Sequence, residues 1–160
     1  MGRHLLPSLV LAAAMLVAGC GGDKPQAGAA APPAAGAGEL TPFQLEHGIG
    51  PVTQPVALEG KVDEALAAKG KALFETKCSA CHKMTEKYVG PPLGDVLARR
   101  TPAYVMNMIL NPEGMYTRHP TAKQLLGEYM TQMPNLGLTQ EEARQLVEYF
   151  RTQATSKTGS

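Results

Sequence analysis

Residues 77–83, KCSACHK, place Cys78 and Cys81 three positions apart, with His82 directly after the second cysteine. Four kinds of site use such a group: a disulfide, a zinc site, a thiol-redox motif and a covalently attached c-type haem. The rest of the chain has to discriminate among these four readings.

The alternatives to haem find little support elsewhere in the chain. A disulfide between Cys78 and Cys81 requires only an oxidising compartment. Zinc requires four ligands, and the sequence has no second C-x-x-C or H-x-x-x-H pair. A thioredoxin-like motif belongs in a βαβ unit, whereas no stretch here alternates convincingly enough for a strand. C-x-x-C-H is the recognised signature of haem attachment. Two cysteines one helical turn apart can reach both vinyl groups as thioethers, and His82 then points its ring at the iron.

The composition agrees with a small globular protein that folds around an added apolar body. Hydrophobic residues make up 44% of the 160 residues and charged residues 18%, but aromatic residues only 5%, with no tryptophan. A small domain so poor in aromatic residues has a thin core, which a haem would fill. The formal net charge of +1 argues against nucleic acid as the main partner.

The N-terminus has the features of an export signal. A short basic start precedes an apolar run from Leu5 to Val17, which is too short for a spanning helix. Residues 16–20, LVAGC, resemble the bacterial lipoprotein signal box, which implies that Cys20 is lipidated and becomes the first residue of the mature chain. This reading also accounts for the odd number of cysteines; an ordinary signal peptide with a chance cysteine is the alternative.

The sequence predicts five segments in order. Residues 1–19 form a lipoprotein signal peptide. Residues 20–38 form the lipidated cysteine and a flexible linker of mostly Gly, Ala and Pro. Residues 39–60 form an irregular arm, because their prolines and glycines forbid a long helix. Residues 61–154 form the globular domain, and residues 155–160 a disordered tail.

The globular domain is predicted to be all-α, with three to four short helices. Residues 61–76 show apolar spacing near 3.6. Thr101 and Pro102 start a second helix that must stop before Pro112. A third helix covers residues 120–130. The fourth begins at Thr139, where Glu142 completes a capping box.

Residues 61–154 resemble a bacterial monohaem cytochrome c of the class I fold. The resemblance rests on elements in the family's order, namely Gly70 and Phe74 in a G-x-x-x-F pattern, C-x-x-C-H at residues 78–82, G-P-P-L at residues 90–93 and Met133-Pro134 before the last helix. It implies one haem c linked to Cys78 and Cys81 inside a cytochrome c-like fold. It also implies that Gly70 lets the last helix cross closely, with Leu146 and Tyr149 or Phe150 against Phe74.

The resemblance implies two axial ligands for the iron and a hydrogen-bond partner for one of them. His82 is the first ligand, and the carbonyl of Pro91 accepts the proton on the far side of its ring. Met133 is the expected second ligand, because Pro134 ends the helix and frees the side chain. Met130 is the alternative, although it continues the third helix and is expected in the core.

The remaining methionines and histidines are expected to serve other roles. Met84 is too near His82 to cross the haem, Met106 packs in the core, and Met115 lies in a loop that could swing in. His119 is the rival sixth ligand, but its neighbours indicate an exposed helix start. Met108 in the second helix and His47 in the arm are expected to have structural roles. Arg99 and Arg100 are either partners of the haem propionates or a solvated helix end. Three residues could line the haem pocket: Tyr88, Tyr104 and Asn107.

These readings predict an electron-transfer protein rather than an enzyme. A His/Met-ligated iron has no open position for substrate, and the thioether raises its potential. We expect a carrier tethered to the periplasmic side of a bacterial membrane, between a quinol-oxidising complex and a terminal reductase or oxidase, with nitrous-oxide reductase as one possible acceptor. The alternatives are a peroxidase or nitric-oxide sensor with a displaceable ligand, or a fixed subunit of a larger respiratory complex.

Overall fold

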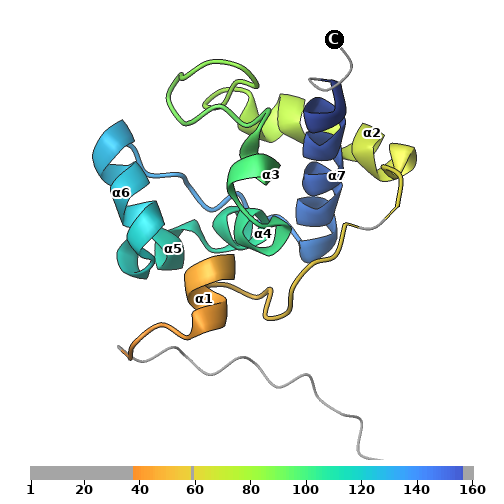
Figure 1. Cartoon of the computed structure of the whole chain (residues 1–160). Coiled ribbons are helices and arrows are strands. Elements are labelled where there is room, and N and C mark those ends of the chain that lie inside the picture. The colour runs from red at the N-terminus through yellow and green to blue at the C-terminus, as the bar shows by residue number, and fades with distance from the viewer. Residues whose placement is uncertain (1–37, 59, 157–160) are drawn as a thin grey trace, which may run out of the picture. The chain divides into compact units, whose positions relative to one another are not determined.

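The computed structural model describes residues 38–58 and 60–156, and within these ranges it is all-helical, as predicted (Figure 1). The elements in chain order are α1 (Pro42–His47), α2 (Glu64–Leu73), the π-helical turn η1 (Phe74–Cys78), α3 (Val96–Arg99), α4 (Pro102–Leu110), α5 (Pro112–Arg118), α6 (Pro120–Tyr129) and α7 (Gln140–Ser156). None of the described helices is both long and apolar enough to cross a membrane. The predicted signal peptide, Cys20 and nearly all of the linker lie outside the described residues.

The local signals in the sequence start the helices where they were expected. The Thr101 side chain accepts a hydrogen bond from the Tyr104 N–H, with Pro102 in the first turn of α4. At α7 the Thr139 hydroxyl accepts from the Glu142 N–H at 3.2 Å, and the Glu142 carboxylate accepts from the Thr139 N–H at 2.8 Å. These bonds hold the pKa of Glu142 below its usual range. The capping box is thereby confirmed.

The structure adds short helices that the sequence reading did not separate. The helix that begins at Pro102 ends at Leu110, before Pro112, as predicted. Pro112 then opens a further helix, α5, whose first turn is capped by the Asn111 side chain. The arm was expected to be irregular throughout, but it contains α1, capped by Thr41. At the C-terminus, α7 runs to Ser156, two residues into the segment expected to be a tail.

The close crossing of α2 and α7 organises the main core. A Cβ atom at Gly70 would collide with the backbone carbonyl of Gln145, so only glycine permits this approach. Directly beside it, the Phe74 ring lies 5.6 Å from the Tyr149 ring and 6.3 Å from the Phe150 ring, centroid to centroid. Leu146 is fully buried in the same cluster. The helix crossing predicted from the G-x-x-x-F pattern is confirmed.

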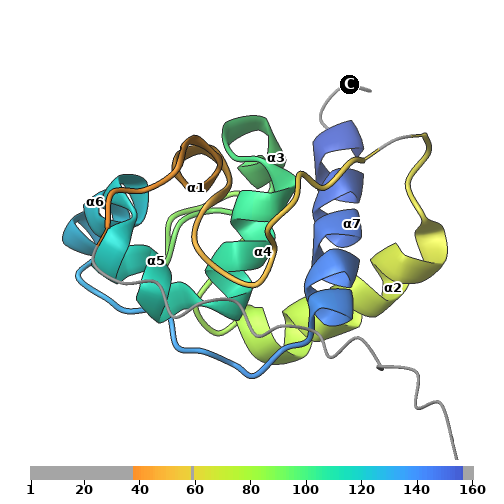
Figure 2. The same ribbon diagram turned by 90° about the horizontal axis from the view of Figure 1, so that it is seen from below.

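The arm lies along α4, and one buried amide holds it there (Figure 2). The Asn107 side chain is fully buried. Its amide nitrogen donates to the carbonyls of His47 (3.0 Å) and Val52 (2.9 Å), and its oxygen accepts from the Val52 N–H (3.0 Å). All three bonds are to arm backbone, which leaves the side chain satisfied. Asn107 therefore fastens the arm and is not available to a ligand.

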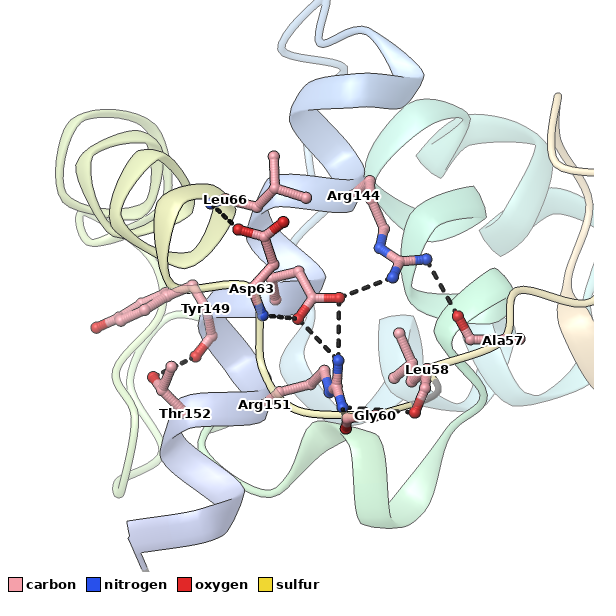
Figure 3. A network of polar contacts seen from close by, with 10 residues as sticks. Ala57, Leu58, Gly60, Asp63, Leu66, Arg144, Tyr149, Arg151 and Thr152 are labelled. Carbon is pink, nitrogen blue, oxygen red and sulfur yellow. Dashed lines mark hydrogen bonds and ion pairs between the residues drawn. The ribbon is translucent and has the colours of Figure 1, made fainter.

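A buried ion-pair network fastens the segment between the arm and α2 to α7 (Figure 3). The Glu148 side chain is only 1% exposed, and it accepts from Arg144 at 2.7 Å and from Arg151 at 2.9 Å. The same guanidinium groups donate to the carbonyls of Ala57 and Gly60. The carboxylate thus holds two arginines that in turn hold the backbone of the connecting segment.

We expect the Gly70→Ala substitution to lower the free energy of unfolding by about 1–3 kcal/mol, because the added methyl forces α2 and α7 apart. Gly127→Ala in α6 is the matched control, since nothing lies within 4 Å of its Cβ position. That change should be neutral or stabilise by up to about 1 kcal/mol through helix propensity. Denaturant unfolding of the haem-loaded protein measures both. Equal effects at the two positions would contradict the close-crossing argument.

Candidate functional site

The π-helical turn η1 carries the first cysteine of the motif to the edge of the core. The Ser79 N–H donates to the Phe74 carbonyl at 2.9 Å, which widens the last turn after α2. The His82 N–H then bonds the Cys78 carbonyl at 2.9 Å. Phe74 is buried, Cys78 is half-buried and Cys81 is exposed. The C-x-x-C-H segment thus starts at the end of η1 and continues as a turn that ends at the half-buried His82.

The two thiols are free, and their chemistry differs from that of a redox-active dithiol. Burial raises the pKa of the Cys78 thiol to about 11, against the smaller opposing effect of Lys77. A thiol-redox motif needs a depressed pKa, because the thiolate is the nucleophile. Cys78 therefore stays protonated at neutral pH. A protonated thiol is the group that adds across a vinyl double bond to form a thioether.

The orientation of the His82 ring is fixed by a backbone carbonyl. Its Nδ1 lies 2.9 Å from the carbonyl oxygen of Pro91, the contact that the resemblance implies. Because a carbonyl can only accept, Nδ1 must carry the proton, and Nε2 keeps its lone pair. Burial lowers the pKa of His82, against the opposing effect of the Pro91 bond, so the ring is neutral. A neutral imidazole with a free Nε2 lone pair is ready to bind a metal ion.

Gly90 leaves the space in which this ring sits. A Cβ atom at Gly90 would lie 2.5 Å from Cε1 and 2.9 Å from Nδ1 of His82. The loop is folded back on the motif, because the Gly90 N–H bonds the Cys81 carbonyl at 2.8 Å. Sequence reasoning gave a role only to Pro91 in the G-P-P-L segment. The contact between Gly90 and the imidazole was missed, although the glycine of that motif was its signal.

The segment that carries Met133 follows α6 and has no regular structure. Met133 is half-buried and packs against the same core cluster as Cys78 and Leu93. An ion pair of 3.1 Å between Lys87 and Glu128 joins the loop after His82 to the end of α6. The loop that follows His82 is thus tied to the helix that precedes Met133.

Met130 does not lie in the core, which corrects the expectation from the sequence. It forms the C-cap of α6 in the left-handed conformation (φ 51°), and its side chain is 84% exposed. Met133 packs against the main core cluster, whereas Met130 does not.

Two other expectations for sulfur and nitrogen ligands are corrected by burial. Met115 is not in a loop: it belongs to α5, is fully buried, and its sulfur accepts the Ile49 N–H at 3.0 Å. His119 is not on the surface: it is 1% exposed, and its Nε2 bonds the Leu45 carbonyl at 3.1 Å. Both are enclosed because the arm covers them, and the sequence pattern near them gave no sign of that cover. Met106 is buried, as expected.

The remaining candidates divide between structural contacts and open surface. His47 bonds the Thr101 hydroxyl at 2.9 Å, in keeping with a structural role. Arg99 pairs with Asp95 at 2.9 Å. Tyr88 is 55% exposed.

The donor set fits a covalently attached haem better than a bare metal ion. It consists of two free thiols, a neutral imidazole and a thioether, set around an apolar core. In the described ranges, no group of three or more His, Cys, Asp or Glu side chains is placed to hold a metal ion. The partly buried apolar residues that pack against the main core include Cys78, Met84, Leu93 and Met133. An apolar edge of this kind suits a macrocycle.

Comparison with known proteins gives consistent matches. The family model "Cytochrome c" matches residues 67–154. A cytochrome c from Rhodothermus marinus is 48% identical, with a TM-score of 0.68 over 72% of this chain and 99% of that one. An engineered form of that cytochrome, in a structure with a bound carbene intermediate, gives a TM-score of 0.65 with the same identity and coverage.

A curated relative, the cytochrome c-553-like protein of Synechocystis sp., is 31% identical over 61 residues. This stretch is 38% of the chain, and the chain spans about half (53%) of that relative's length.

We expect Gly90→Ala to disturb the His82 ring, because the new methyl would overlap the imidazole. The variant should incorporate less covalent haem, and the fraction that loads should show a weakened axial histidine bond. Haem content per chain and the optical spectrum measure this effect. Gly127→Ala again serves as the control, and wild-type loading and spectra for Gly90→Ala would refute the steric argument.

Proposed function

The chain belongs to the cytochrome c family, and on this basis we propose that it is a one-electron carrier with a single haem c bound axially by His82 and Met133. Members of the family are electron-transfer proteins with covalently bound haem. The residues of this chain are the basis for the proposed ligand pair, membrane tether and partners.

The observation that carries the ligand proposal is the fixed tautomer of His82. The Pro91 carbonyl holds the Nδ1 proton, so Nε2 is the atom presented to the iron. When bound, haem c supplies the Fe(II)/Fe(III) couple. Met133 is the favoured partner because it packs against the same core cluster as Cys78 and is followed by Pro134. A neutral thioether donor favours the ferrous state and so raises the reduction potential.

The proposed ligand set leaves no open position on the iron for a substrate. Cys78 and Cys81 would hold the cofactor covalently, beside the core cluster to which α4 and α7 contribute. Rigid ligands that stay in place in both oxidation states keep reorganisation small. These properties suit electron transfer rather than substrate turnover.

We expect Met133→Ala to abolish the weak far-red absorption band that a sulfur-to-ferric-iron bond produces, and to lower the reduction potential. Met130→Ala, a change of the same chemistry at an exposed position, should leave both unchanged. Optical spectra of the oxidised and reduced haem protein, with a redox titration, measure these effects.

Two alternatives to the free carrier remain. The first is a haem enzyme or sensor whose sixth ligand can be displaced, and the second is a fixed subunit of a larger respiratory complex. The engineered relative with a bound carbene intermediate is the reason to test the first of these. A wild-type protein that lacks the far-red band and binds carbon monoxide or peroxide readily would support the enzyme or sensor and overturn the carrier proposal.

The proposed location is the periplasmic side of a bacterial membrane, with lipid on Cys20 as the anchor. The support is the LVAGC box and the Gly/Ala/Pro-rich residues that follow it. A carrier on such a tether suits exchange between a quinol-oxidising complex and a terminal reductase or oxidase, nitrous-oxide reductase among them.

We expect Cys20→Ala to move nearly all of the protein from the membrane fraction to the soluble periplasmic fraction. The reason is that one cysteine carries every acyl chain of the anchor. Immunoblots of the two fractions, with haem staining, measure the change, and Gly22→Ala is the control. If Cys20→Ala stays on the membrane as well as the control does, the anchor proposal fails.

A further inference from the structure

The loop of residues 83–90 is braced against the C-x-x-C-H segment by hydrogen bonds. The Gly90 N–H donates to the Cys81 carbonyl at 2.8 Å, and the Lys83 ammonium donates to the Ser79 carbonyl at 3.0 Å. Any group that this loop carries therefore has a defined position relative to the haem motif.

The segment that would supply the sixth ligand of the iron has fewer attachments. The methionine loop, defined as residues 130–138, follows α6 and contains Met130 and Met133. Among the hydrogen bonds of the described residues, one joins this loop to an element other than α6, from the Asn135 amide to the Leu110 carbonyl at 3.4 Å. The other attachment is the packing of partly buried side chains against the core, Met133 among them.

One lysine joins the braced loop to the end of α6, directly before the methionine loop (Figure 1). Nζ of Lys87 lies 3.1 Å from Oε1 of Glu128 and 4.3 Å from the centroid of the Tyr129 ring. Glu128 and Tyr129 are the last two residues of α6. A single ammonium thus contacts both of the residues after which the methionine loop begins.

These contacts matter because little else holds the end of α6. An exposed ion pair alone contributes little, and the side chains of Lys87 and Glu128 are 56% and 50% exposed. The half-buried Tyr129 ring adds a cation–π attraction to the same ammonium. Ala122, in the first turn, is the one buried residue of α6, so the last turn has no buried side chain of its own. The two attractions together therefore determine how firmly that turn is held.

The two parts that Lys87 joins carry ligands for opposite faces of a haem, because the axial ligands of the iron stand on either side of the porphyrin. His82 directly precedes the braced loop, and the methionine ligand belongs to the methionine loop. Dissociation of the methionine requires its loop to move away from the iron. A link between the two parts opposes that movement.

We propose that Lys87 is a positioning residue that keeps the methionine loop closed and so slows dissociation of the sixth ligand from the iron. The inference rests on the proposed function, because it requires a haem whose sixth ligand is a methionine. It holds for either methionine of the loop, since Glu128 and Tyr129 precede both. A ligand that stays in place keeps reorganisation small, and Lys87 supports this from the surface of the domain.

Variants of the haem-loaded protein test this proposal. Lys87→Met removes the charge and keeps an unbranched side chain, Lys87→Arg keeps the charge, and Glu128→Gln removes only the ion pair. Lys123→Met is the matched control: it removes an exposed charge from α6, and no ion pair of the described residues includes Lys123. The measurement is the rate at which the ferric protein binds imidazole at saturating concentration. Imidazole can bind the iron only after the sixth ligand has dissociated, so this limiting rate reports opening of the loop.

We expect Lys87→Met to raise the limiting rate by about 3- to 30-fold. Glu128→Gln should raise it less, because the cation–π contact remains, and Lys87→Arg and Lys123→Met should stay near the wild-type rate. Added sodium chloride should raise the rate of the wild type, because salt screens the exposed ion pair, but should not change that of Lys87→Met. A wild-type rate in Lys87→Met, or an equal rise in Lys123→Met, overturns the proposal.

The far-red band of the ferric protein is recorded for every variant. A wild-type protein without this band refutes the proposed ligand pair and the role of Lys87 together. A wild-type protein that has the band, combined with an unchanged rate in Lys87→Met, refutes only the role of Lys87.

Discussion

The close crossing of α2 and α7 at Gly70 is the contact on which the rest of the domain depends. Because no side chain separates the backbones there, Phe74 can reach Tyr149 and Phe150, and the end of α2 is fixed against the core. The π-helical turn then starts from a fixed point, so Cys78 and His82 leave the helix in a defined direction. One missing Cβ atom thus positions the residues that would hold the cofactor.

The ligand site is oriented by backbone rather than by charged side chains. The Pro91 carbonyl selects the tautomer of His82, and Gly90 leaves room for the ring. A carboxylate partner could gain a proton at low pH and release the ring. A backbone carbonyl cannot ionise, so the orientation of the His82 ring does not depend on pH in this way. A fixed imidazole suits a carrier that has to keep the same ligand in both oxidation states.

The arm adds a second cluster of buried apolar residues to the main core of the domain. Asn107 binds its backbone three times, and Glu148 with its two arginines secures the connection to α2. Beneath the arm lie Tyr104, Met115 and His119, all of them buried.

The sequence by itself determined the features that depend on near neighbours in the chain. The haem motif, the all-helical class and the caps at Thr101 and Thr139 were predicted because spacing and capping act within a few residues. The close crossing at Gly70 was expected only from the resemblance to cytochromes c. Only the tertiary structure decided the burial of His119, the enclosure of Met115 and the exposure of Met130. The first two depend on an arm some 70 residues away in the chain, whose backbone covers them. The third depends on a left-handed cap, which the apolar pattern of α6 does not encode. Burial is a property of what packs on a residue, and that is set by contacts distant in sequence.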